Sequence, residues 1–92
     1  QIKSHWDLIP ADTDILITHG PVFSKLDLTN GGQNVGCKDL LVKVEKIQPK
    51  FHICGHIHEA YGQVKDSKTN YINASVLNEN YYLKNSPISF DI

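Results

Sequence analysis

The 92-residue sequence predicts a small α/β domain, and three observations carry that prediction. Two short apolar runs, Asp14–Thr18 and Phe51–Cys54, have the length and the flanking turn residues of buried strands. A stretch with helical periodicity, Cys37–Gln48, lies between them. A strand, a helix and a second strand in this order are typical of a sheet whose two strands run parallel.

Two further segments flank the first predicted strand. The polar segment Ile2–Asp12 precedes it, and three apolar residues are expected to anchor this segment to the core: Trp6, Leu8 and Ile9. The segment Val22–Val35 follows the strand, contains Asn30-Gly31-Gly32 and shows no clear period. It is predicted to be a long loop, and loops of this length in compact domains are usually functional or mobile.

The helix predicted at Cys37–Gln48 has one apolar face. Its apolar residues recur at i, i+3, i+4, i+7 and i+10: Cys37, Leu40, Leu41, Val44 and Ile47. Gly36 precedes this stretch and Pro49 follows it. Proline disfavours the helical conformation at the residue before it, so the helix is expected to end at Gln48.

The last third of the chain predicts β structure. Tyr61–Lys65 and Asn70–Val76 flank the turn-forming Asp66-Ser67-Lys68 and therefore predict a hairpin. Three apolar residues that alternate with polar ones predict a half-buried terminal strand: Ile88, Phe90 and Ile92.

Composition narrows the class of protein. The formal net charge is -1, so we expect no nucleic-acid polymer as a partner. All nine basic residues are lysines, which excludes a guanidinium clamp for phosphate within the chain. No apolar run approaches the roughly 20 residues of a membrane-spanning helix, and no secretory signal is visible, so we expect a cytoplasmic protein with no membrane partner. Cys37 and Cys54 lack CxxC spacing, which favours two free thiols over one disulfide.

Three of the five histidines follow the two predicted parallel strands. His19 comes directly after the first strand, and His56 and His58 follow the second. The carboxyl ends of parallel strands meet at one edge of a sheet, where open α/β sheets bind their ligands, so we expect the three to converge. Imidazole is the commonest metal ligand, and the pattern predicts a metal site. Polar loop histidines that bond to the backbone are the alternative.

The other two histidines fit a different reading. His5 lies in the polar N-terminal segment, where a loop histidine is expected. His52 lies inside the second strand pattern, where a buried and hydrogen-bonded core histidine is expected.

Several motifs together resemble a known superfamily. Thr18-His19-Gly20-Pro21 and Gly55-His56-Ile57-His58 resemble the last two metal-binding motifs of the calcineurin-like metallophosphoesterases. The surrounding blocks are similar to one small branch, the metallophosphoesterase-domain-containing proteins, which are cyclic-nucleotide phosphodiesterase-like. These blocks are Asp12–Pro21, Asn34–Cys37, Gly55–Glu59 with Tyr61-Gly62, and Ile72–Ser75. The resemblance runs from about Trp6 to the end of the chain.

The resemblance implies a fold, a cofactor and an activity. It implies that residues 1–92 are the C-terminal segment of one metallophosphoesterase domain, a four-layer α/β/β/α sandwich with a binuclear metal centre. In it, His19 and His56 would bind the second metal ion and His58 the first. Manganese, iron or zinc would suit such ligands. The implied activity is hydrolysis of a phosphomonoester or phosphodiester, nucleotides among them, by a metal-activated hydroxide.

Three motifs that come earlier in this family are not present in the chain. They are aspartate-x-histidine, glycine-aspartate and glycine-asparagine-histidine, which carry the bridging aspartate, the remaining ligands and the histidine that assists the leaving group. The catalytic residues are therefore unknown, and this segment alone is expected to be inactive without the N-terminal half, which a separate chain could supply. The alternatives are a non-catalytic metal- or nucleotide-binding module and a mononuclear zinc site of three histidines.

A few further residues are candidates for roles near the metals. Asn73 and Ser75 match a block on the substrate side in this branch, so they are candidate substrate-binding residues, with a structural role as the alternative. Glu59 could accept a hydrogen bond from an imidazole N–H or remain a solvated loop carboxylate. Three tyrosines could stack on a base or pack at the core or its rim: Tyr61, Tyr81 and Tyr82.

Overall fold

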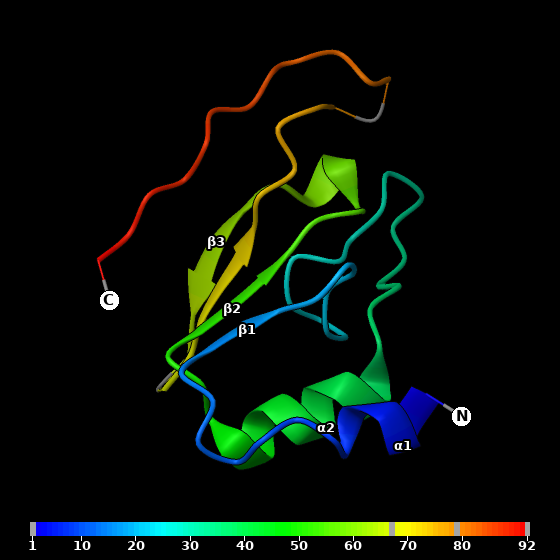
Figure 1. The fold of residues 1–92 in the computed structure, drawn as a ribbon. Coiled ribbons are helices and arrows are strands. Elements are labelled where there is room, and N and C mark those ends of the chain that lie inside the picture. The colour runs from blue at the N-terminus through cyan, green and yellow to red at the C-terminus, as the bar shows by residue number, and fades with distance from the viewer. Residues whose placement is uncertain (1, 67, 79, 92) are drawn as a thin grey trace.

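The computed structural model describes residues 2–66, 68–78 and 80–91, and its centre is a mixed four-stranded sheet (Figure 1). The sheet has the order β1-β2-β4-β3. Its strands are β1 (Ile15–Ile17), β2 (Phe51–Cys54), β3 (Gly62–Lys65) and β4 (Asn70–Asn73). The helices are α1 (Ile2–Trp6) and α2 (Lys38–Ile47), with a 3-10 turn η1 (His58–Ala60).

The predicted parallel pairing of the first two strands is confirmed. β1 pairs with β2 in parallel, and β2 pairs with β4 in parallel. Hydrogen bonds extend the first pair at both ends, because Phe51 N–H donates to Asp14 O at 3.2 Å and Thr18 N–H donates to Ile53 O at 2.9 Å. The carboxyl ends of β1, β2 and β4 therefore lie at one edge of the sheet.

The predicted crossover helix is also confirmed, with a cap at each end. Cys37 is the N-cap of α2, and its Sγ accepts a hydrogen bond from Leu40 N–H at 3.4 Å. Gln48 ends the helix in the left-handed conformation at a φ of 52°, and its N–H donates to Val44 O at 2.8 Å. Pro49 then prevents the helix from continuing.

The two helices lie together along one side of the sheet and form the core with it (Figure 1). The buried cluster consists of Val22, Leu40, Val44 and Tyr71. Trp6 and Ile9 pack against this cluster, as predicted. The anchor predicted at Leu8 is wrong, because its side chain is 78% exposed. The chain leaves α1 through a turn in which Leu8 N–H donates to His5 O, and this turn points Leu8 outward.

The hairpin of β3 and β4 is confirmed, and the Asp66 carboxylate organises its turn. β3 runs antiparallel to β4. The Asp66 carboxylate accepts hydrogen bonds from the N–H groups of Thr69 and Lys68 and from the Tyr71 hydroxyl. These bonds hold the pKa of Asp66 below its usual range, and the bond from Thr69 N–H contributes most. The turn residue Ser67 lies outside the described residues.

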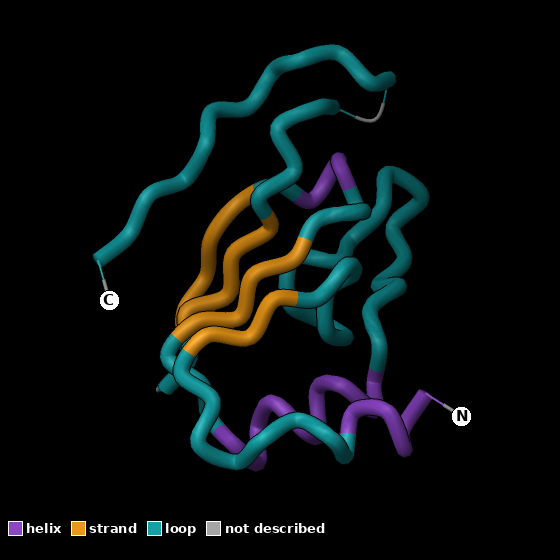
Figure 2. Tube along the Cα trace, in the orientation of Figure 1, coloured by secondary structure: helices purple, strands orange, loops and turns teal. Residues whose placement is uncertain are grey.

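The terminal strand predicted at Ile88, Phe90 and Ile92 is wrong as far as the structure describes it. Residues 86–91 have no strand hydrogen bonds and run as a loop beside the sheet (Figure 2). Ile92 lies outside the described residues. The Phe90 ring stacks on the Phe51 ring of β2 with 4.2 Å between the centroids. The alternation of apolar and polar residues thus reflects side chains that pack on the sheet. It did not specify a strand with which the backbone would form hydrogen bonds.

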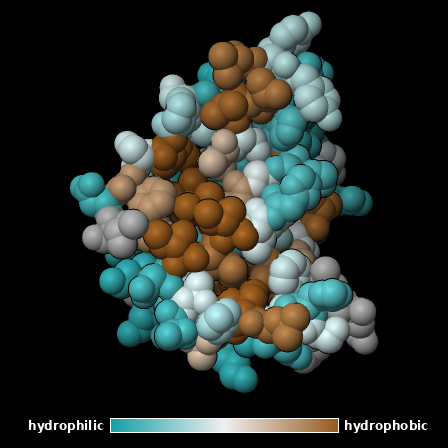
Figure 3. All heavy atoms as spheres, in the orientation of Figure 1, coloured by the Kyte–Doolittle hydropathy of each residue, from teal (hydrophilic) through white to brown (hydrophobic). Residues whose placement is uncertain are grey.

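Several apolar side chains of the sheet stay open to solvent. Within the described residues β1 has a neighbouring strand on one side only, and its Ile17 is 72% exposed. Figure 3 shows apolar side chains gathered over the strands on the face in view. Strands of a parallel sheet are usually covered on both faces, so this surface is suited to a further layer of protein.

Both cysteines are free, as predicted. Cys54 is buried in β2, and burial, together with the Asp27 carboxylate, raises the pKa of its thiol to about 12. It therefore stays a neutral thiol at physiological pH. Among the helices described here, none has the length and the apolar character that crossing a membrane requires.

The predicted long loop, Val22–Val35, is held by one buried carboxylate. Asp27 is 1% exposed and accepts hydrogen bonds from Ser24 N–H at 2.9 Å, Gly36 N–H at 2.8 Å and Asn34 Nδ2 at 2.7 Å. Three donors satisfy the buried charge, so the loop is closed on itself by a charge-assisted network.

Gly36 lets the end of this loop lie against its beginning. A Cβ at position 36 would lie 2.2 Å from the carbonyl oxygen of Val22, which is far inside van der Waals contact. We predict that Gly36→Ala lowers the free energy of unfolding by about 3 kcal/mol, because backbone atoms cannot move aside as a side chain can. Urea denaturation measures this change. Gly20→Ala is the control, since a Cβ there meets nothing within 4 Å. An equal loss for both variants would contradict the explanation.

Candidate metal centre

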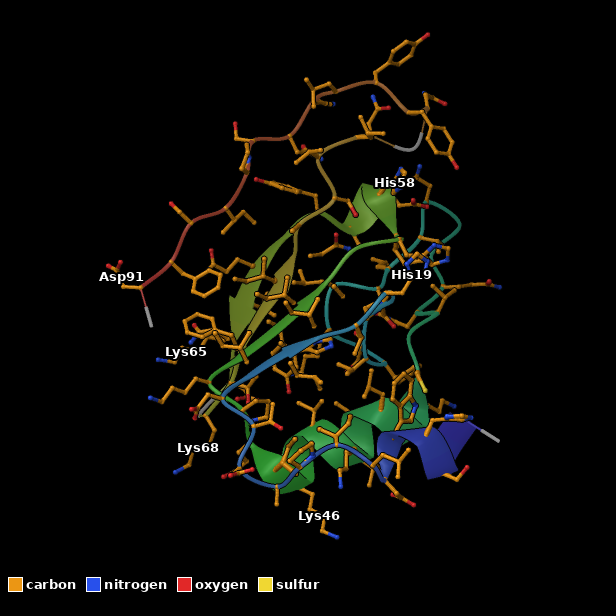
Figure 4. All side chains as sticks on the ribbon, in the orientation of Figure 1. His19, Lys46, His58, Lys65, Lys68 and Asp91 are labelled. Carbon is orange, nitrogen blue, oxygen red and sulfur yellow. The ribbon has the colours of Figure 1, made fainter. Side chains whose placement is uncertain are left out.

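Two of the three predicted ligands meet where β1 and β2 end. Beyond the strands, Gly55 N–H donates to His19 O at 3.0 Å, so the parallel pairing continues into both loops. His19 and His56 are at or next to the residues that this bond joins, and their rings lie together, with 4.5 Å between the centroids and 42° between the planes. Both side chains are exposed, and Figure 4 shows His19 at the same end of the sheet as His58. Two imidazoles at this spacing are within reach of one metal ion.

The backbone at His56 is strained. Its φ is 68°, which is unusual for a residue other than glycine. Ile57 N–H donates to Gly55 O at 2.7 Å across it, so His56 is the central residue of a γ-turn. Strain of this kind is often found at functional sites, where the surrounding structure maintains it.

His58 lies in a different environment from this pair. Its Nδ1 is 3.0 Å from the carbonyl oxygen of Asn78. A carbonyl oxygen only accepts hydrogen bonds, so Nδ1 carries the proton and Nε2 of the neutral ring keeps its lone pair. A ring nitrogen fixed in this way is typical of histidines that bind metals.

The three histidines do not form one site. Among residues 2–66, 68–78 and 80–91, no group of three or more histidine, cysteine, aspartate or glutamate side chains could hold a single metal ion. A three-histidine site is therefore not preformed in this part of the chain, and how the histidines share metal ions stays a prediction. A ring contact joins His19 to His56, whereas His58 is held by its bond to Asn78 O.

Asn73, at the end of β4, fixes the loop that carries His56 and His58. Its side chain is fully buried, and its Nδ2 donates to Ile57 O at 2.9 Å and to Leu26 O at 3.2 Å. Its Oδ1 accepts from Ser75 N–H at 3.1 Å. All three bonds are internal, which supports the structural alternative for Asn73 over substrate binding.

Ser75 remains a candidate on different grounds. Its hydroxyl oxygen is buried and has no hydrogen-bond partner within the described residues. It lies beside Gly55, because a Cβ at that glycine would be 3.5 Å from Ser75 Oγ. The substrate role predicted for Ser75 stays a prediction.

A buried histidine fixes the loop that carries His19. His52 is 1% exposed, and its Nε2 lies 2.9 Å from Thr18 Oγ1. The Thr18 hydroxyl donates its one proton to Gly20 O at 2.6 Å, so it accepts from the Nε2–H of His52. The expected core role of His52 is confirmed, and the two bonds tie the residues on either side of His19 to the core.

A hollow of about 270 Å³ lies beside the histidine pair. It is lined by Trp6, His19, Gly20, Pro21, Val35, Cys37, Leu40, His56 and Ile57. Its apolar wall and two imidazoles could accommodate a small molecule that carries an anionic group.

The hydrogen bond that the structure gives Glu59 runs to the long loop and not to an imidazole. Its Oε2 accepts from Asn30 N–H at 3.2 Å, so it links η1 to the long loop. Of the three tyrosines, Tyr61 is half-buried and its hydroxyl donates to Ser86 O. Tyr81 and Tyr82 are 74% and 71% exposed, so a core position is wrong for both.

Two residues that organise the site were missed in the sequence. Asp27 stands between two leucines in the long loop, and a charged residue in an apolar setting was a signal that could have indicated it. Asn78 binds His58 through its backbone carbonyl, and a backbone contact leaves no mark on the residue type.

Of the curated proteins that are similar to this chain, some carry a metallophosphoesterase name and others are named only UPF0046. Metallophosphoesterase domain-containing protein 1 of Homo sapiens is 49% identical over 89 residues, which are 95% of this chain and 27% of that protein. A UPF0046 protein of Caenorhabditis elegans is 47% identical over 93 residues, covering 100% of this chain and 24% of that protein. A second UPF0046 protein of this nematode is 42% identical, with 100% and 31% covered. No family model matches the chain.

The similarity covers nearly all of this chain but only part of each relative. The chain spans between 24% and 31% of the length of these three proteins. What they share with it is therefore one segment of a longer protein.

We predict that the free energy of unfolding decreases as the pH is lowered, because of His52. Burial lowers its pKa from 6.5 to about 4, so the unfolded chain binds a proton between these values that the folded chain does not. Above pH 6.5 His52 is neutral in both the folded and the unfolded chain, so the free energy of unfolding has its full value. It declines by about 3 kcal/mol as pH falls to about 4. His52→Gln keeps an N–H donor and removes the titration. Urea midpoints across this range should fall more steeply for the wild type, and parallel curves would contradict the prediction.

We predict that the strain at His56 is measurable as stability. Glycine adopts a φ of 68° without penalty, whereas alanine does not. His56→Gly should therefore be more stable than His56→Ala by about 1 kcal/mol in thermal unfolding, although both lack the imidazole. If His56→Ala proved equally stable, the γ-turn would not be strained.

Proposed function

Since the chain is homologous over most of its length to one segment of metallophosphoesterase domain-containing proteins, we propose that it forms part of a metal-dependent phosphoesterase. The observation that carries the proposal is the approach of His19 and His56 at the shared edge of β1 and β2. Their rings lie beside a hollow that is large enough for part of a small phosphoester. The substrate is a phosphomonoester or phosphodiester, and nucleotides are among the candidates.

The donor set fits two divalent metal ions. His19 and His56 would hold one ion, and His58 would contribute to the other through Nε2, because its Nδ1 donates to Asn78 O. Metal ions in such a centre stabilise charge on phosphoryl oxygens and supply hydroxide near neutral pH. Manganese, iron or zinc would suit imidazole with carboxylate ligands.

The chain's own contribution is to position these side chains before any ligand binds. The bond from Gly55 N–H to His19 O sets the distance between the two loops. Asn73 holds Ile57 between the two ligands of the second loop, and His52 holds Thr18 beside His19. Polar groups fixed in this way require little rearrangement during the reaction.

The remaining ligands, the bridging carboxylate and the leaving-group histidine would come from the other part of the domain. We therefore propose that residues 1–92 alone hydrolyse no phosphoester and that the missing part covers the exposed apolar surface near Ile17. The proposed partners are that other part of the domain and a small phosphoester. We place the protein in the cytoplasm and propose neither a nucleic-acid polymer nor a membrane as a partner.

We predict that the two histidines of the second loop serve different metal ions. His19→Ala and His56→Ala, in the complete domain, should weaken the same ion and combine non-additively, because neighbours that share a site are coupled. His58→Ala should weaken the other ion, and its effect should be more nearly additive with that of His19→Ala. Elemental analysis and activity against metal concentration measure this for the single variants and the two double variants.

The outcomes of that experiment separate the rival functions. Coupling of His19 to His58 as strong as its coupling to His56 would overturn the two-ion assignment. Metal binding without hydrolysis of any phosphoester would instead support a non-catalytic binding module. Gly20→Ala is a control for the loop, because it changes no ligand and meets no neighbouring atom.

A further inference from the structure

An exposed run of apolar residues begins beside His58. Tyr81, Tyr82 and Leu83 form a run of three apolar residues, each more than 70% exposed. Contiguous exposed apolar side chains usually mark a binding surface in a protein of this size. The first of the three contacts a predicted metal ligand, because the Tyr81 ring stands edge-to-face against the His58 ring, with 5.1 Å between the centroids and 77° between the planes.

The turn that presents Tyr81 is ordered by the residue that also fixes His58. The backbone oxygen of Asn78 accepts from His58 Nδ1 at 3.0 Å and from Tyr81 N–H at 2.9 Å. The Asn78 side chain accepts from the N–H groups of Asn80 and Tyr82. The position of the Tyr81 ring is thus coupled to that of the imidazole through one residue.

The turn is also held in a conformation that costs free energy. Tyr81 has a φ of 65°, which is unfavourable for a bulky side chain. Lys84 N–H and Asn85 N–H both donate to Val76 O and close the base of the loop. The Tyr81 ring is thus exposed among the described residues although its backbone is strained, and its free face is available to a group bound beside His58.

We propose that Tyr81 determines specificity, by stacking on a planar aromatic group of a phosphoester whose phosphoryl group is bound at His58. The inference rests on the proposed function, because it needs the phosphoryl group at that histidine. The edge-to-face contact with His58 uses only part of the ring, and the 74% exposure leaves the remainder free. Stacking on aromatic side chains is tolerant of the ring's identity, so an aryl ester and a nucleotide share the required chemistry.

The chain offers closely matched variants for the test. Tyr81→Leu keeps apolar volume and removes the aromatic face, whereas Tyr81→Phe keeps the face. Tyr82→Leu is the positional control, because Tyr82 is the next residue and almost equally exposed, whereas the ring that stands against His58 is that of Tyr81. None of these residues is a proposed metal ligand.

The experiment measures binding of two pairs of probes to the complete protein loaded with Mn²⁺, by calorimetry. The first pair is phenylphosphonate and methylphosphonate, and the second is adenosine 5′-monophosphate and ribose 5-phosphate. We expect the wild type to prefer the aromatic member of at least one pair by about tenfold. Tyr81→Leu should bring this ratio close to one, while Tyr81→Phe and Tyr82→Leu should retain it. A ratio lost only in the second pair would assign a nucleobase, and one lost in the first pair would assign an aryl group.

Two results would overturn the inference and can be told apart. Metal-dependent binding with a ratio that Tyr81→Leu leaves unchanged, or that Tyr82→Leu lowers equally, would reject the role of Tyr81 alone. If no probe bound in a metal-dependent manner, the proposed phosphoesterase function would fail, and the role of Tyr81 would fail with it.

Discussion

The candidate site depends on one backbone hydrogen bond, from Gly55 N–H to His19 O at 3.0 Å. It is the last bond of the parallel pair β1 and β2, and it forms after both strands have ended. Parallel pairing requires a crossover, which α2 provides, and it brings residues distant in sequence to the same edge of the sheet. The approach of His19 to His56 is therefore a consequence of topology, and the loops only refine it.

That refinement is performed by buried polar groups. Asn73, His52 and Asp27 are almost inaccessible to solvent, and each uses its hydrogen bonds to hold a loop at the site. A buried polar group without partners is costly, so each position is specified strongly once its network forms. The strained γ-turn at His56 and the positive φ of Tyr81 are maintained inside this framework.

The sequence predicted the framework better than the details of the site. Apolar runs and a helical period were sufficient for β1, α2 and β2, because burial of side chains determines these patterns. The alternation of Ile88 and Phe90 failed as a strand prediction, because it reports which side chains pack and not which backbone pairs. The assignment of His58 to a different metal ion from His19 and His56 came from the family resemblance. Two histidines that are two residues apart in a loop can point in the same or in different directions, so the spacing alone did not decide it. The contact of His58 with Asn78 was invisible in the sequence because it involves a carbonyl group.

The arrangement proposed above is that His19 and His56 share one metal ion while His58 binds another. Anomalous diffraction from crystals of the complete domain loaded with Zn²⁺ tests it most directly. We expect two peaks, one about 2.1 Å from a ring nitrogen of both His19 and His56 and the other at the same distance from His58 Nε2. A single peak that all three histidines share, or one that His56 and His58 share without His19, would contradict it.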